Sequence, residues 1–129
     1  MNFLDVTSRI VDGVMVVDIK GELSRRASSL SNPLKELLAD GRSSLILNLS
    51  AVSYVDSSGL GQLITVWTSI GKRGGQFILL GPSPQVRKQL EITKLDTVFT
   101  IIKDEAEAIR RIQKLASART SLATGITWT

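Results

Sequence analysis

The sequence predicts a single α/β domain, built on a mixed β-sheet of about five strands with about four helices. Short runs rich in Val, Ile and Leu alternate with segments of helical periodicity through the second half, a pattern typical of parallel strands joined by helices. Near the N-terminus two apolar runs flank Asp12-Gly13, a turn signal that indicates an antiparallel hairpin. The length of 129 residues suits one compact domain and is too short for two ordinary ones.

The first half of the chain contains the hairpin, one helix and a central strand. Its expected strands cover residues 3–10, 14–20 and 45–49, the last extended by residues 51–55. A polar stretch precedes Pro33, which favours the first position of a helix that carries Leu34 on its apolar side. Gly41 is the predicted stop for this helix.

A second helix is expected directly after the central strand. Its apolar residues recur at spacings of three and four, which predicts one buried face made of Leu60, Leu63, Ile64, Trp67 and Ile70. Gly74-Gly75 interrupts the pattern and marks the end of the helix.

The last part of the chain predicts two more strands and two more helices. The strands are expected at residues 76–80 and 98–102, and Ser83 is the predicted cap of the helix between them. Asp104 caps the final helix, with Glu107 completing a variant of the capping box. The helical pattern decays beyond Ala116, so we expect residues 1–116 to form the domain and residues 117–129 a flexible tail.

The composition excludes several classes of function. The chain has no Cys and no His, so a thiolate or His-ligated zinc site, a cysteine nucleophile and a Ser-His-Asp hydrolase are excluded; we assign no catalytic residue, metal or cofactor. No apolar run approaches the roughly 20 residues of a membrane-spanning helix, and the N-terminus lacks a signal peptide, so a cytoplasmic protein is expected. The net charge of +4 is dispersed and aromatics make up 5%, which argues against nucleic-acid binding.

The hexapeptide Asp56-Ser57-Ser58-Gly59-Leu60-Gly61 is the strongest functional candidate, because it lies where the central strand gives way to the second helix. The first backbone N–H groups of a helix lack internal partners and carry partial positive charge, so anions are favoured there. Asp56 could simply cap the helix, hydrogen-bond a neighbouring backbone or orient the Ser57 hydroxyl. The sequence does not choose between these roles.

In order along the chain, five segments resemble the STAS domain family, and more narrowly its anti-sigma factor antagonists. These are Gly21-Glu22-Leu23, residues 45–50, residues 55–61, Gly74-Gly75 and Ala106-Glu107-Ala108. The likeness covers about residues 3–115. It implies a partner-switching regulator that is not an enzyme: the unphosphorylated protein binds an anti-sigma factor serine kinase, phosphorylation inactivates it, and a serine phosphatase resets it.

The family motif places the phosphorylated residue on Ser57, the first hydroxyl after the Asp. The resemblance also implies partner-binding residues around it, namely Glu22, Ser24, Asp56, Ser57, Ser58, Gly59, Leu60 and Gln62. Two positions depart from the family pattern, since Asn48 and Ser24 stand where an Asp is common. Both replacements remove a negative charge, so the docking face is less acidic if these positions help to dock the kinase. The alternative is that Asn48 caps a local turn and Ser24 is a loop residue.

Two other functions stay open at this point. The first is a STAS scaffold or adaptor, a subunit of a signalling complex or membrane transporter that is not regulated through Ser57. The second is nucleotide binding or catalysis, although the chain has no GxxxxGK[ST] phosphate loop. A homodimer is also left open.

Overall fold

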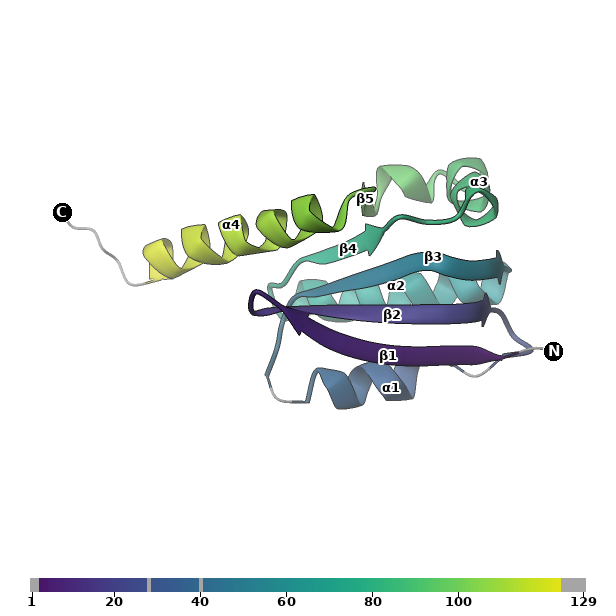
Figure 1. The fold of residues 1–129 in the computed structure, drawn as a ribbon, viewed down its shortest axis with the longest axis horizontal. Helices are drawn as coiled ribbons and strands as arrows, with labels where there is room; N and C mark the ends of the chain where they lie inside the picture. Colours follow the sequence, from purple (N-terminus) through teal and green to yellow (C-terminus); the bar gives the residue numbers. More distant parts are fainter. Residues whose placement is uncertain (1–2, 28, 40, 124–129) are drawn as a thin grey trace.

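Five strands form one mixed sheet in the computed structural model, which describes residues 3–27, 29–39 and 41–123. The strands follow one another across the sheet in chain order, with β1 antiparallel to β2 and the other neighbours parallel (Figure 1). Their bounds are β1 Leu4–Val11, β2 Val14–Leu23, β3 Leu45–Val55, β4 Phe77–Leu80 and β5 Thr100–Ile102. The predicted fold class is confirmed.

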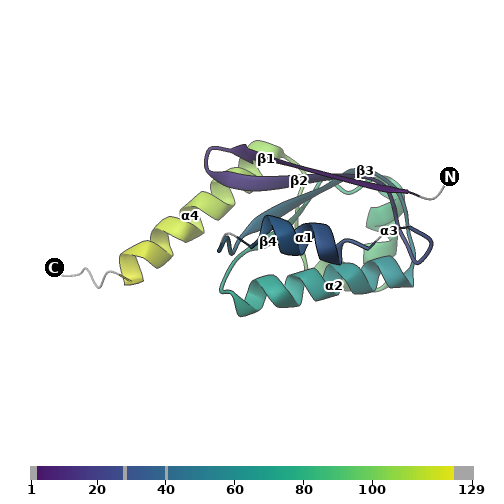
Figure 2. The ribbon, with the colours of Figure 1, turned by 90° about the horizontal axis from the view of Figure 1, so that it is seen from below.

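The helices cover both faces of the sheet. They are α1 Ser31–Leu37, α2 Ser57–Lys72, α3 Pro84–Ile92, the short 3₁₀ helix η1 Leu95–Thr97 and α4 Glu105–Ala123. Figures 1 and 2 show α1 and α2 on one face of the sheet and α4 on the other. No helix in the described part of the chain is long and apolar enough to cross a bilayer.

Alternation along the strands divides the core into two layers. Leu45 and Leu47 of β3 pack with the helices α1, α2 and α3, whereas Ile46 packs with Ala108 and Ile109 of α4. All five of these side chains are buried. Because β3 is apolar on both faces over this stretch, it lies at the centre of the sheet, as a buried parallel strand must.

The buried face of α2 is rotated slightly from the predicted one. Ile64 and Trp67 are 39% and 42% exposed, and Val66 lies in the core instead. Val66 follows Leu63 by three residues and precedes Ile70 by four, so it continues the same apolar stripe. Trp67 lies at the margin of this stripe, where its ring meets the ring of Phe99 edge-on with centroids 6.4 Å apart.

Several local details differ from the predicted ones. Helix α1 begins at Ser31, two residues before Pro33. The strand expected at 98–102 begins only at Thr100, because the 3₁₀ helix η1 ends at Thr97 and a turn follows it. Ser83 begins α3 without capping it, because its hydroxyl donates instead to the Val52 carbonyl at 2.8 Å. The local sequence favoured a capping hydrogen bond to the Ser83 side chain, but in the structure the hydroxyl bonds to a distant strand instead.

Helix α4 continues through Ala123, past the predicted boundary at Ala116. No Gly or Pro occurs in this extension before Gly125, and adding a residue to an existing helix gains a hydrogen bond without a new nucleation cost. Residues 124–129, including Trp128, lie outside the described residues. The flexibility of residues 117–129 stays a prediction.

A cluster of charged side chains fastens the start of α4 to the edge of the sheet. Arg9 of β1 donates through Nε to Asp18 of β2 at 2.7 Å and through Nη1 to Glu105 of α4 at 3.0 Å. These hydrogen bonds from Arg9 hold the pKa of both carboxyl groups below their ordinary values.

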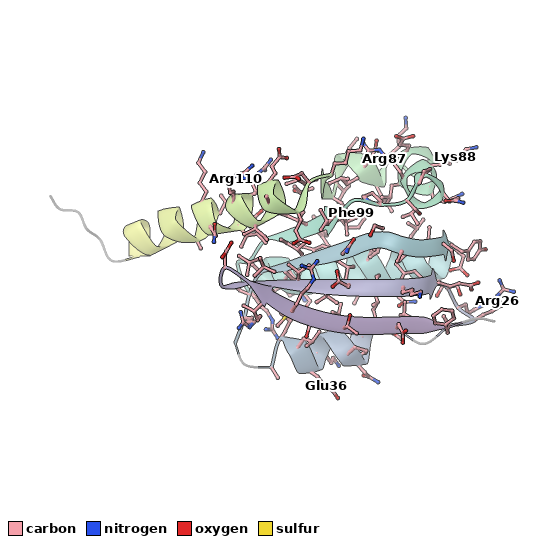
Figure 3. The ribbon with its side chains drawn as sticks, in the orientation of Figure 1. Arg26, Glu36, Arg87, Lys88, Phe99 and Arg110 are labelled. Carbon is pink, nitrogen blue, oxygen red and sulfur yellow. The ribbon has the colours of Figure 1, made fainter. Side chains whose placement is uncertain are left out.

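The other basic residues are spread over the surface, as Arg26, Arg87, Lys88 and Arg110 show (Figure 3).

The Arg9 cluster predicts how stability depends on pH. Asp18 and Glu105 bind protons more weakly in the folded chain than in the unfolded chain, so their stabilisation is present above a pH of about 4 and is lost as the pH falls through the folded pKa values. Arg9→Met should lower the free energy of unfolding at pH 7 by roughly 1–2 kcal/mol, because these half-exposed groups are partly screened. When denaturant unfolding is measured from pH 7 to pH 3, the free energy of unfolding should fall less steeply with decreasing pH in the variant than in the wild type. An unchanged pH dependence would contradict the role given to Arg9.

Candidate functional site

The Ser57 site forms where the carboxyl ends of β2 and β3 meet the N-terminus of α2. The two strands are parallel, so Leu23 and Val55 lie side by side at the same edge of the sheet. The Asp56 backbone N–H donates to the Leu23 carbonyl at 3.2 Å, which continues the pairing for one residue beyond the strand. The chain then enters α2 at Ser57. This edge is the usual position of ligand and partner sites in parallel α/β sheets.

Asp56 is the cap of α2, and its carboxylate binds backbone groups from two segments. It accepts hydrogen bonds from the Gly59 N–H at 2.9 Å and from the Arg25 N–H at 3.2 Å. The Gly59 hydrogen bond, with further backbone bonds from Arg25 and Ser58, lowers the pKa of Asp56 and keeps it ionised. Of the roles that the sequence left open for Asp56, the structure shows capping together with a bond to a neighbouring loop.

Ser57 is the first residue of α2 and is exposed, whereas Ser58 is half-buried. No described residue hydrogen-bonds the Ser57 hydroxyl. The carboxylate that caps the helix belongs to its neighbour, so Ser57 is not needed for capping. Its hydroxyl is therefore available for chemical modification without loss of the cap.

Gly59 is present because the backbone approaches too closely for a side chain. A Cβ atom at this position would lie 1.9 Å from the Leu23 carbonyl oxygen and 2.8 Å from Cγ2 of Val55. No real Cβ contact is that short, so only glycine lets α2 start directly against the ends of β2 and β3. Gly61 on the same helix has nothing within 4 Å of the corresponding position.

The other predicted site residues surround this junction. Ser24 is buried and its hydroxyl donates to Glu22 Oε1 at 3.1 Å, while Leu60 is 7% exposed and packs in the core. Gln62 accepts a hydrogen bond through Oε1 from the Leu30 N–H at 2.9 Å. The eight residues thus lie between the end of β2 and the second turn of α2.

The loop between β2 and α1 is the part of the site that sequence reasoning missed. Its Arg25 N–H binds Asp56, its Leu30 N–H binds Gln62, and Arg26 lies 4.0 Å from the Glu22 carboxylate. Two of these contacts use backbone N–H groups, which every residue type except proline carries. No motif or periodicity could have identified them.

Asn48 lies away from this junction, on the sheet face that α4 covers. Its amide donates to Asp18 Oδ1 at 2.7 Å, and its Oδ1 accepts from the Ser50 N–H at 3.1 Å and from the Ser50 hydroxyl at 2.8 Å. Asn48 therefore belongs to the Arg9 cluster. An Asp at this position would bring a second carboxylate against Asp18.

Neither a metal centre nor a covalent catalyst is suggested by the side chains around Ser57. Within the described ranges, no three His, Cys, Asp or Glu side chains are grouped as metal ligands would be. Asp56, the acidic group closest along the chain, is committed to backbone N–H groups. The arrangement presents one free hydroxyl beside one fixed negative charge.

Comparison with known protein families tests the family resemblance that the sequence motifs indicated. The STAS domain family model matches residues 5–108, which include every residue of the Ser57 site. The chain belongs to the STAS domain family. Its site is therefore the N-terminus of the second helix of a STAS domain, reached directly from the central strand.

Similar STAS proteins include several anti-sigma factor antagonists. The chain is 31% identical over 108 residues to a Thermotoga maritima protein assigned to that group, covering 82% of this chain and 96% of the relative. An anti-sigma factor antagonist from Mycobacterium paratuberculosis has a crystal structure with a TM-score of 0.68 and 26% identity, covering 85% and 94% of the two chains. The antagonist SpoIIAA in its unphosphorylated form gives a TM-score of 0.63 at 25% identity, covering 85% and 97%.

Two glycines on one helix test the close approach at the site. Gly59→Ala should destabilise the fold by about 2 kcal/mol or more, because its methyl group would overlap the Leu23 carbonyl. Gly61→Ala, the matched control, should be neutral or stabilising by up to about 1 kcal/mol, since it adds a helix-favouring residue in open space. Urea unfolding measures both. Equal stability of the two variants would show that α2 can move away from β2 at little cost.

Proposed function

We propose that this STAS protein is an anti-sigma factor antagonist that works by partner switching. In its unphosphorylated form it binds an anti-sigma factor with serine kinase activity, and phosphorylation of Ser57 releases that partner. A serine phosphatase restores the binding form. The observation that carries the proposal is the exposed, unbonded Ser57 hydroxyl beside a separately fixed cap, in a chain similar to proteins of this group.

The contacts of Asp56 suggest how the phosphate would act. The Gly59 N–H already binds the Asp56 carboxylate, so it is not free to neutralise a phosphate on Ser57. Phosphorylation would add about −1.5 to −2 charges next to this ionised carboxylate. The partner would then meet a dense negative patch, and repulsion would weaken its binding. A tenfold loss of affinity needs only about 1.4 kcal/mol.

The predicted site residues divide into two groups under this proposal. Ser57, Ser58, Gln62 and Glu22 are at least partly exposed and can touch the partner, and Asp56 supplies the fixed charge. Ser24, Gly59 and Leu60 are buried, so they would shape the site without direct contact. The partner's surface would include the first two turns of α2 and the loop after β2.

Mass spectrometry of the protein purified from its own cells tests the switch. Samples are taken during growth, starvation and stress. Fragmentation should locate phosphate on Ser57 in at least one of these conditions, and on no other residue of the site. A Ser57 that stays unmodified throughout would favour the constitutive scaffold or adaptor instead. In that case the STAS fold is retained while the regulation is absent.

Binding of the partner by three variants tests the mechanism. Ser57→Ala should retain full binding to the anti-sigma factor kinase and lose regulation, and Ser57→Asp should bind at least about tenfold more weakly. Ser58→Ala is the matched control, since it removes a neighbouring hydroxyl and should stay phosphorylatable. Calorimetric titration gives the affinities, and thermal unfolding checks that each variant is folded. Equal affinity of Ser57→Ala and Ser57→Asp would count against the mechanism.

A further inference from the structure

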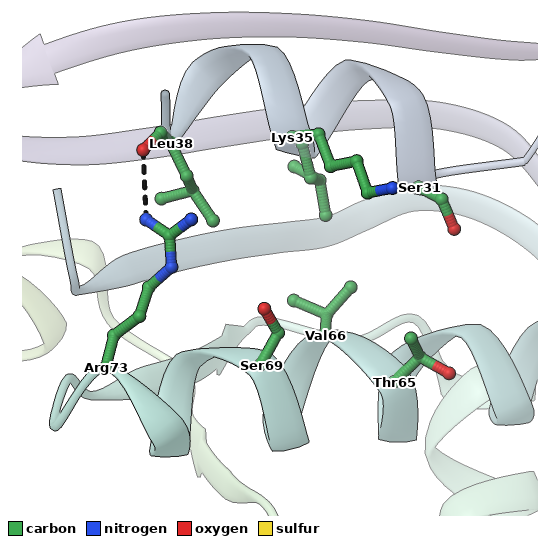
Figure 4. A pocket seen from close by; sticks show the side chains of 8 residues that line it. Ser31, Lys35, Leu38, Thr65, Val66, Ser69 and Arg73 are labelled. Atoms are coloured by element: carbon green, nitrogen blue, oxygen red, sulfur yellow. Dashed lines mark hydrogen bonds between the residues drawn. The ribbon is translucent and has the colours of Figure 1, made fainter. Parts of the chain in front are cut away.

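A small cavity separates α1 from α2, on the sheet face that carries the Ser57 site. It has a volume of about 90 Å³. Its walls are mainly apolar and come from Leu34 and Leu38 of the α1 segment and Val66 of α2, and Ser31 and Ser69 also line it. Figure 4 shows Leu38 and Val66 pointing into the gap from opposite sides. A water molecule takes up about 30 Å³ of liquid, so the space corresponds to a tail of roughly three or four carbon atoms.

Arg73 closes one end of this cavity and has one edge of its guanidinium group free. Its Nη1 donates to the carbonyls of Leu38 and Arg42, both at 2.9 Å, and so holds the end of α1. Its Nε and Nη2 make no hydrogen bond to any residue that the structure describes. In Figure 4 these two nitrogens face the gap between the helices. That edge of a guanidinium group binds a carboxylate through two parallel hydrogen bonds.

The charges around the opening favour an anion over a neutral molecule. Lys35 also lines the cavity, and no described residue forms an ion pair with its ammonium group. Among the residues that the structure describes, no acidic one lines the cavity. The cavity therefore combines mainly apolar walls, a free bidentate donor edge at one end and a second positive charge among its lining residues.

From these contacts we propose that the space between α1 and α2 is a binding site for a small monocarboxylate with a short aliphatic tail. The carboxylate binds Nε and Nη2 of Arg73, and the tail lies against Leu34, Leu38 and Val66. Polyanions fit less well, because a single guanidinium edge satisfies one carboxylate and the walls beyond it are apolar. The site is independent of the phosphorylation proposed for Ser57.

Titration with three probes tests the site in the full chain. Sodium pentanoate should shift the amide signals of α1 and α2 saturably in two-dimensional NMR, with affinity in the millimolar range. Pentan-1-ol has the tail without the charge and acetate has the charge without the tail, so both should bind several-fold more weakly. Equal affinity for pentanol and pentanoate would overturn the assignment of the carboxylate to Arg73. An absence of saturable shifts with pentanoate would overturn the site.

Two pairs of variants separate binding from folding. Ser69→Phe places a ring in the wall of the cavity and should abolish pentanoate binding, whereas Thr68→Phe on the neighbouring position of α2, outside the cavity, should leave it unchanged. Arg73→Met should raise the Kd for pentanoate about fivefold or more, while Lys72→Met should not. Because Arg73 also holds α1, Arg73→Lys is included: it keeps the charge and should still bind more weakly than the wild type. Equal binding by Ser69→Phe and Thr68→Phe would contradict the proposal.

Discussion

The contact between Gly59 and the Leu23 carbonyl is the constraint on which the site depends. It lets the first turn of α2 lie directly on the ends of β2 and β3, at a distance that no other residue permits. The loop after β2 is then close enough for the Arg25 N–H to reach Asp56. As a result, hydrogen bonds from two segments fix the Asp56 carboxylate. Ser57 lies at the surface, and its hydroxyl takes no part in capping the helix. The exposed hydroxyl is a consequence of how tightly its neighbours are packed.

Much of the fold could be predicted because its signals are local. Strand β4 is a continuous apolar run, and β2 and β3 are rich in Val, Ile and Leu. Asp12-Gly13 and Asp104 carry turn and cap signals that do not depend on distant residues. The buried face of α2 was predicted only in part. Spacing alone cannot tell Val66 from Trp67, because both lie near the apolar stripe and the sheet decides which one it covers.

The parts that could not be predicted are contacts between segments far apart in the chain. Arg25 and Leu30 contribute backbone N–H groups to the site, and these leave no trace in the sequence. Asn48 is instructive for another reason. Its difference from the common family residue left two interpretations open, a less acidic docking face or the cap of a local turn. Its side chain lies on the opposite face, where it donates to Asp18 and accepts from the Ser50 N–H, which favours the cap. A substitution in a motif has to be placed in three dimensions before its charge can be interpreted.

The order of the strands has a consequence for how the molecule is made. Because β1 to β5 follow one another across the sheet in chain order, each new strand is added at the edge formed by the one before it. No strand has to be inserted between two that have already paired. The residues of the Ser57 site lie within positions 22–62, so they leave the ribosome before β4, α3, β5 and α4. The nascent chain can therefore assemble in the direction of its synthesis, with the Ser57 site among the first parts to form.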